Sequence, residues 1–188
     1  QANPPLVEHE FVDIFKAGLV IPKEEHNRML EESLPQLSSL SGPACSGPRI
    51  LLSCFIFEEC IDPACDIITM VEELGGNIVA DDLLFGARYF GQPVELKDDP
   101  IEALVGGYVG KIPMAFKYHS EPRADMLVEL ARSSRAQGAI IIVPKYCTCY
   151  LWENPYIASR FKDAGMPTLF LESTTRMPAM PTRTRLEG

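Results

Sequence analysis

The chain has 188 residues, of which 46% are hydrophobic and 23% charged, and its formal net charge is −9. This balance is typical of a globular protein with a real core and excludes disordered and fibrous classes. The acidic excess argues against general nucleic-acid binding, which needs a basic face to neutralise phosphates. No apolar run approaches the ~20 residues of a membrane span. The first residues lack the pattern of a signal peptide.

The N-terminal quarter of the chain is predicted to be helical and to end in a linker. Residues 8–19 and 22–40 are predicted as helices, the second with leucines at helical spacing. Residues 41–48, rich in Ser, Gly and Pro, predict a linker. We therefore expect a helical lead-in over residues 1–48 and an α/β domain over residues 49–188.

In the second part of the chain, short apolar runs alternate with helical segments. Continuous apolar runs are typical of parallel strands covered on both faces. The predicted strands are residues 49–55, 77–80, 139–143 and 167–171. The predicted helices are about residues 62–74, 100–112, 121–137 and 153–164. This alternation predicts an open, mainly parallel α/β sheet, Rossmann-like or flavodoxin-like, with helices on both faces and right-handed crossovers.

Polar side chains gather where the predicted strands end. In open parallel sheets, ligands bind outside the carboxyl ends of the strands. The residues that this topology would bring to one rim are Ser53, Cys54, Asp81, Asp82, Lys145, Cys147, Cys149, Glu172 and Ser173. Each has a simpler alternative: the acidic residues can cap helices or lie in solvated turns, and Cys54 can belong to the core.

The cysteines are candidates for metal binding, and they are Cys45, Cys54, Cys60, Cys65, Cys147 and Cys149. Without a secretion signal a disulfide framework is not expected, and no spacing is that of paired zinc knuckles. Cys147 and Cys149 are the better ligand candidates, because they lie in a predicted loop near Lys145, whose charge favours a thiolate. Two thiols do not complete a four-ligand iron or zinc centre.

Three motifs of common enzyme classes are absent from the sequence. No GxGxxG follows the first predicted strand, and neither GxxxxGK[ST] nor GxSxG occurs. Dinucleotide-dependent oxidoreductases, P-loop hydrolases and ordinary serine hydrolases are therefore disfavoured. A Cys–His nucleophile made of Cys147 and His119 is conceivable, but nothing in the sequence links the two residues.

Several segments, taken together, resemble a known family. Near the end of the chain they are GAIIIVPKYCTCYLWENPYI, AGMPTLFLES and RTRLEG, and upstream they are RILLS, DDLLFGARYF and DPIEAL. In this order they resemble the C-terminal domain of the 2-hydroxyacyl-CoA dehydratase and benzoyl-CoA reductase family, of the 2-hydroxyglutaryl-CoA dehydratase D-component type. The resemblance implies that the chain is the C-terminal domain of a longer two-domain subunit.

The resemblance also implies a cytoplasmic iron–sulfur enzyme of anaerobic metabolism that acts on an acyl-CoA. In this family two related subunits pair, each typically with a [4Fe–4S] cluster, and an ATP-hydrolysing activator delivers one electron. The outcome is radical dehydration of a 2-hydroxyacyl-CoA or reduction of an aromatic acyl-CoA ring. Cys147 matches the cluster cysteine of the C-terminal domain. One such ligand predicts that the isolated chain holds no stable cluster and is inactive alone.

Other residues would have supporting roles in such an enzyme. Candidates for contacts with CoA phosphates or a partner subunit are Arg88, Lys145, Arg183 and Arg185, for which surface ion pairing is the alternative. Candidates for orienting neighbouring groups or helix ends are Asp81, Asp82 and Glu172.

The chain departs from the family pattern at Leu84, Thr174, Met180 and Pro181. These departures leave open a non-catalytic subunit that docks on its sister. The pair of Cys147 and Cys149 leaves open a second alternative, a thiol or metal-binding protein. The sequence is compatible with both dehydration and ring reduction, and with more than one acyl group.

Overall fold

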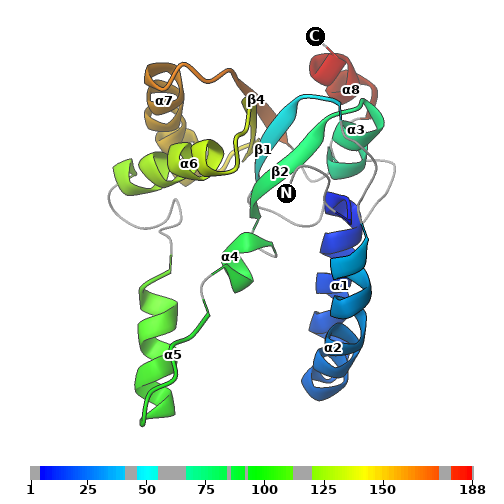
Figure 1. Cartoon of the computed structure of the whole chain (residues 1–188). Coiled ribbons are helices and arrows are strands. Elements are labelled where there is room, and N and C mark those ends of the chain that lie inside the picture. The colour runs from blue at the N-terminus through cyan, green and yellow to red at the C-terminus, as the bar shows by residue number, and fades with distance from the viewer. Residues whose placement is uncertain are drawn as a thin grey trace.

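A four-stranded parallel sheet forms the centre of the chain (Figure 1). The strands are β1 (Arg49–Cys54), β2 (Asn77–Leu83), β3 (Gly138–Pro144) and β4 (Thr168–Ser173). Their order in the sheet is β2-β1-β3-β4, and each neighbouring pair is parallel. Flavodoxin-like sheets begin with the same order, so the predicted open α/β fold is confirmed.

The computed structural model describes most of the chain, namely residues 5–40, 46–54, 67–83, 86–91, 93–111, 120–173 and 179–187. Some predicted features lie outside these residues. They are most of the linker, the start of the helix at Asp62, and the residues His119, Cys45, Cys60, Cys65, Leu84 and Thr174. Met180 and Pro181 are exposed and lie in the C-terminal helix.

Helices from both parts of the chain cover the two faces of the sheet. The helices of the described residues are α1 (Glu8–Val20), α2 (Lys23–Ser39), α3 (Ile67–Glu73), α4 (Ala87–Phe90), α5 (Pro100–Val109), α6 (Glu121–Ser133), α7 (Thr148–Asp163) and α8 (Ala179–Glu187), and not all of them contact the sheet. On one face α6 and α7 pack against the sheet, where Leu51 meets Leu127. On the other face Leu52 packs in a second core with Ile68 of α3 and Val12 of α1. Because successive strand residues point to opposite faces, β1 and β3 supply both cores.

Two boundaries that bear on the site differ from the sequence prediction, and two helices were not predicted. Helix α7 begins at Thr148, so Cys149 lies inside a helix and not in a loop. Strand β2 continues through Asp81 and Asp82, because its pairing with β1 extends to Leu83. Helices α4 and α8 were not predicted, since α4 is a single turn and α8 lacks a clear apolar stripe.

The α1–α2 pair and α5 extend from the same side of the sheet (Figure 1). The described part of the chain covers the predicted leucine stripe of α2 only in part: Leu30 and Leu37 are half-buried, and Leu34 is 56% exposed. None of the described helices has the length and apolarity needed to cross a membrane.

The strand order of the sheet has a switch point between β1 and β3, where successive strands are added on opposite sides of β1. From β1 the chain adds β2 on one side, and it then crosses to add β3 and β4 on the other. In open α/β sheets, the ligand crevice forms at the carboxyl ends of the two strands at such a switch point. In this chain these ends are Cys54 of β1 and Pro144 of β3.

Candidate functional site

The turn after β3 presents Cys147 at the switch point. The Cys147 backbone N–H donates to the Pro144 carbonyl, with an N···O distance of 3.1 Å. Tyr146, the third residue of this turn, has a φ of 67°, in the left-handed region that glycine and asparagine favour. Cys147 occupies the N-cap position of α7 without a side-chain capping hydrogen bond, and its partly buried side chain packs against the α6–α7 core. A helix N-terminus favours negatively charged groups, including a thiolate.

The other candidate ligands at this rim are less well placed. Cys149 is exposed in the first turn of α7, and Cys54 is only 5% exposed within the core on the α3 side. The exposed Lys145 places its Nζ 5.5 Å from the centre of the Tyr146 ring. Within the described ranges, no group of three or more His, Cys, Asp or Glu side chains could hold a metal ion. Among the described residues, the donor set thus fits one ligand of an iron–sulfur cluster, Cys147.

A network of buried charged side chains near the carboxyl ends of β1 and β2 centres on Asp82. Ser53 Oγ donates to Asp82 Oδ2 across the β1–β2 pair at 2.9 Å. Arg88 of α4 donates to both carboxylate oxygens of Asp82. Arg123 of α6 donates from Nη2 to Asp82 Oδ2 at 2.6 Å. The side chains of Asp82 and Arg123 are each 1% exposed, so the network lies inside the protein.

Arg123 also joins this network to α7. Its Nη1 donates to Glu153 Oε2 at 2.9 Å, and its guanidinium carbon lies 5.4 Å from the centre of the Tyr150 ring. Tyr150 and Glu153 lie in the first turns of α7, just after Cys147. The network therefore ties the helix that begins after Cys147 to β1, β2, α4 and α6. Glu153 Oε1 is buried and has no hydrogen-bond partner among the residues that the structure describes.

Burial and charge act against each other on the members of the network. Burial raises the pKa of Tyr150 to about 12, although Arg123 and Arg88 lower it. Burial likewise raises the pKa of Glu153 against the lowering effect of the two arginines. For Arg88, burial lowers the pKa, but the hydrogen bonds and charge of Asp82 outweigh burial and leave the pKa above its ordinary value. Tyr150 is therefore neutral and Arg88 charged at neutral pH.

Asp81 makes different contacts from Asp82. Its Oδ1 accepts hydrogen bonds from the backbone N–H groups of Leu83 and Ala87, both at 2.9 Å, and so holds the turn into α4. Burial raises the pKa of Asp81, although these two hydrogen bonds lower it. This geometry is that of a residue that orients a helix end.

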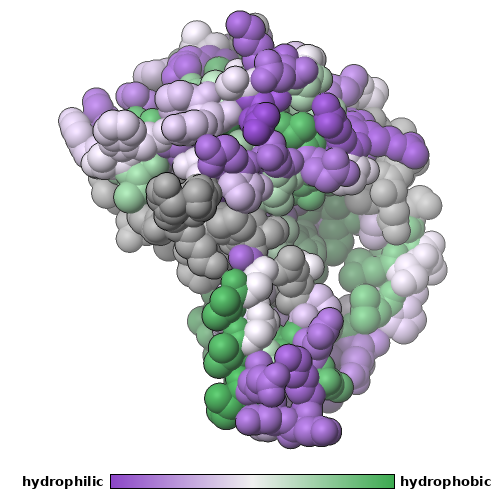
Figure 2. Space-filling view, turned by 90° about the vertical axis from the view of Figure 1, so that its left-hand side faces the viewer, coloured by the Kyte–Doolittle hydropathy of each residue, from purple (hydrophilic) through white to green (hydrophobic). Residues whose placement is uncertain are grey.

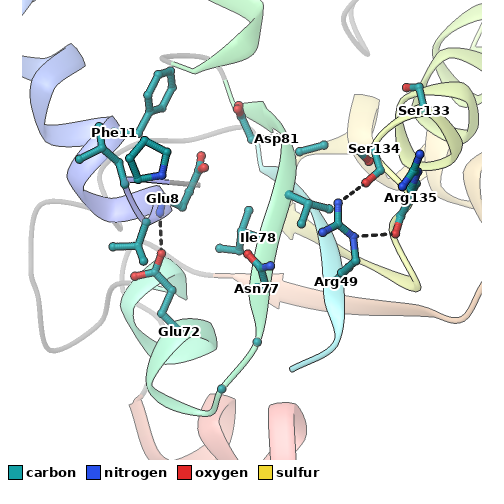
Figure 3. Close-up of a pocket in the computed structure, with 17 residues that line it drawn as sticks. Glu8, Phe11, Arg49, Glu72, Asn77, Ile78, Asp81, Ser133, Ser134 and Arg135 are labelled. Atoms are coloured by element: carbon teal, nitrogen blue, oxygen red, sulfur yellow. Dashed lines mark hydrogen bonds between the residues drawn. The ribbon is translucent and has the colours of Figure 1, made fainter. Parts of the chain in front are cut away.

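A cavity of about 930 Å³ runs along β2, between α1 and the end of α6 (Figure 3). Glu8 lines its α1 side, and burial together with the charges of Asp81 and Glu72 raises the pKa of Glu8 to about 8. On the opposite side, Arg49 donates to backbone carbonyls at the end of α6 (Figure 3). Of the predicted rim residues that the structure describes, only Asp81 borders the cavity. The cavity is therefore separate from the turn that carries Cys147.

The remaining predicted site residues make local contacts. Arg183 is half-exposed and pairs with Glu73 at 2.9 Å, as expected for a surface ion pair. Arg185 donates to the Phe170 carbonyl at 2.8 Å. Glu172 is exposed and lies within β4 and not after it. Arg88 differs from expectation, because its side chain is 7% exposed and engaged with Asp82 and is not at the surface.

Sequence reasoning missed Arg123, Tyr150 and Glu153. Helical periodicity contained a signal for them. Glu153 falls between Tyr150 and Ile157 on the buried face of α7, and Arg123 precedes Leu127 on that of α6. A charged residue at a buried helical position needs a charged or hydrogen-bonding partner, so one such residue on each of two helices indicates a pair.

Comparison with known proteins identifies the family. The family model for 2-hydroxyglutaryl-CoA dehydratase, D-component, matches residues 1–188. The chain belongs to this family. The resemblance seen in the sequence is therefore confirmed.

Two curated relatives are similar to this D-component family member. It is 29% identical over 157 residues to one of the subunits of benzoyl-CoA reductase from Thauera aromatica, a match that covers 82% of the chain and 40% of the relative. It is 20% identical over 164 residues to the beta subunit of (R)-phenyllactyl-CoA dehydratase from Clostridium sporogenes, a match that covers 87% of the chain and 42% of the relative. The chain thus spans about two fifths of the length of these relatives.

Proposed function

We propose that this chain forms the C-terminal part of an acyl-CoA-processing subunit, in an enzyme of the benzoyl-CoA reductase or 2-hydroxyacyl-CoA dehydratase type. In this proposal Cys147 is one thiolate ligand of a [4Fe–4S] cluster, and the other ligands come from the rest of a longer subunit. Family membership and the names of the two relatives support it. The observation that carries it is the position of Cys147, in the turn after β3 at the switch point of the sheet.

The cluster, when bound, would supply one-electron transfer, and this chain would hold and orient one of its ligands. The turn from Pro144 to Cys147 fixes the backbone that carries the thiol, through the hydrogen bond between these two residues. The N-terminus of α7 favours the negative charge of the thiolate. Glu153, held by Arg123, anchors the same helix to the sheet. Such supporting contacts keep a metal ligand in a fixed geometry.

The proposed partners are a related sister subunit, an ATP-hydrolysing activator and the acyl-CoA substrate. The sister subunit is supported by the names of the two relatives, since each is named as one subunit of an enzyme. Lys145 and Arg185 are the better candidates for CoA phosphates, because both are exposed and neither forms an ion pair with the described part of the chain. Arg88 is a weaker candidate, because Asp82 occupies its guanidinium group.

Iron analysis and EPR spectroscopy on two forms of the protein test this proposal. The longer subunit, purified anaerobically with its sister, is expected to carry about four irons for each cluster. Residues 1–188 expressed alone are expected to bind little iron, because one well-placed thiol does not make a cluster site. A longer subunit without iron, or an isolated chain that retains a full cluster, would contradict the proposal.

A further inference from the structure

Helix α5 stands apart from the sheet (Figure 1), and four of its apolar residues form an exposed stripe. Ile101, Leu104, Val105 and Tyr108 are 65%, 45%, 55% and 63% exposed. Their spacing places them on one face of the helix. In Figure 2 hydrophobic residues gather along one side of the protruding lower part of the molecule, next to hydrophilic ones. We call these four residues the α5 stripe.

Among the described residues, Tyr108 of the α5 stripe contacts Lys111, whose Nζ lies 4.7 Å from the centre of its ring. The other contacts that anchor α5 involve residues outside the stripe. Ala103 is buried. Gly107 lies so close to Val94 that an added Cβ would be 2.9 Å from Val94 Cγ2. Glu102 pairs with Lys97 at 3.2 Å. These contacts anchor α5 to the segment that precedes it and leave the α5 stripe exposed.

A helix with this length and composition needs a partner on its apolar face. Its 10 residues are fewer than the about 12–15 that isolated helices need to persist in water. Gly106 and Gly107 weaken it further, because glycine has a low helix propensity. A contiguous exposed apolar face on such an element marks an interaction site.

We propose that the α5 stripe docks against the part of the same longer subunit that lies outside residues 1–188. This proposal rests on the proposed function, in which the chain is one part of a longer polypeptide. The relatives support this occupant, because the match covers only 40% and 42% of their lengths and leaves more than half of each polypeptide available. The α1–α2 pair extends on the same side, and Val20 there is 84% exposed (Figure 1).

Covalent connection favours this occupant over a separate protein. A segment of the same polypeptide is present at a high effective concentration as soon as it is synthesised, so it covers the α5 stripe before subunits assemble. If the stripe waited for a separate subunit, each newly made copy would expose a continuous apolar surface, which promotes aggregation.

Site-specific photo-crosslinking in the complete enzyme tests which occupant is present. The photoreactive residue p-benzoylphenylalanine replaces Val105 in the longer subunit. The matched control carries it in place of Glu102, which is exposed on the same helix but outside the α5 stripe. We expect a cross-link within one polypeptide, from position 105 to a peptide outside residues 1–188, with a yield several-fold higher than from position 102.

Three outcomes would overturn the proposal: cross-links to the sister subunit, cross-links between two copies of this subunit, or equal yields from both positions. Amide hydrogen exchange gives a second readout. Val105→Asp should speed exchange in α5 of the longer subunit several-fold, whereas Glu102→Gln should leave it nearly unchanged, and equal effects would again overturn the proposal. Iron content measured on the same preparation tests the proposed function separately, because the cross-link assignment does not depend on it.

Discussion

Arg123 is the residue whose loss should damage the fold most clearly. Its side chain is 1% exposed and bridges Asp82 and Glu153. Arg123→Met keeps a long side chain but leaves Glu153 without its cation, while Asp82 retains Arg88 and Ser53. Removing one partner of a buried ion pair costs about 3–5 kcal/mol. We therefore expect Arg123→Met to lower the free energy of unfolding by that amount, out of a typical total of about 5–15 kcal/mol.

The loss should depend on pH, because Glu153 becomes a buried carboxyl without its ion-pair partner and only the more distant charge of Arg88 remains to lower its pKa. With Arg123 present, burial already raises the pKa of Glu153 above its ordinary value of 4.5. Without Arg123 the folded-state pKa rises further, so the folded state favours the protonated carboxyl. The stabilisation that protonated Glu153 contributes is therefore complete below the pKa that Glu153 has in the unfolded chain. It is lost as the pH rises through the higher pKa of the folded state, by at most about 1.4 kcal/mol per pH unit. The variant should therefore lose more at neutral pH than in mild acid.

Urea unfolding followed by circular dichroism measures both effects. A double variant, Arg123→Met with Glu153→Leu, should recover much of the loss, because apolar residues can replace a buried ion pair at little cost. Arg160→Met is the matched control: it breaks an exposed pair with Asp125, with an N···O distance of 2.9 Å, and should cost less than about 1 kcal/mol. A similarly small loss for Arg123→Met, or a further loss in the double variant, would show that the buried pair does not stabilise the fold in this way.

Three further predictions concern single residues. Tyr146 and Arg135 have φ values of 67° and 58°, where a β-branched side chain is more strained than the residues present, so valine at either position should lower Tm. Only Tyr146→Val should also lower the iron content of the complete enzyme, and iron loss with Arg135→Val would contradict this. Burial raises the pKa of Glu8 from 4.5 to about 8, so the folded state favours the protonated carboxyl. The contribution of Glu8 to the free energy of unfolding is therefore complete below pH 4.5 and is lost as the pH rises through 8. Glu8→Gln should flatten the dependence of Tm on pH, and unchanged curvature would count against the assignment. Asp99 caps α5, because its carboxylate accepts a hydrogen bond from the Ile101 N–H at 2.8 Å. Asp99→Ala should destabilise α5 by about 1 kcal/mol and speed amide exchange in that helix alone. Unchanged exchange in α5 would show that the cap does not stabilise it.

The sheet was predictable from the sequence because its signal is local. Apolar runs such as residues 49–54 and 139–143 indicate strands covered on both faces, and glycine stops separate them from helices. The end of β2 was missed because Asp81 and Asp82 look like loop residues. Their burial within a strand depends on partners that lie elsewhere in the chain, such as Arg123 for Asp82.

The candidate site was predictable only in part, for the same reason. Family resemblance indicated Cys147, and parallel topology indicated that its turn lies at the ligand-binding edge. Arg123 and Glu153 lie 30 positions apart on different helices. Helical periodicity indicates that each charge is buried, but it does not show where the two helices place the pair relative to Asp82. A helix was predicted over residues 100–112, but the α5 stripe was not, because its exposure depends on how α5 lies relative to the sheet, which the three-dimensional structure shows.

The decisive question for the proposed function is whether Cys147, and not Cys149, ligates the cluster. Both cysteines lie at the start of α7, so Cys149→Ser is a matched control for Cys147→Ser. Iron content and the EPR spectrum are measured on the complete, anaerobically purified enzyme. We expect Cys147→Ser to lose iron or to change the spectrum of the cluster that it ligates, while Cys149→Ser matches the unmodified enzyme. Full iron and an unchanged spectrum in Cys147→Ser would contradict the assignment of Cys147 as a cluster ligand.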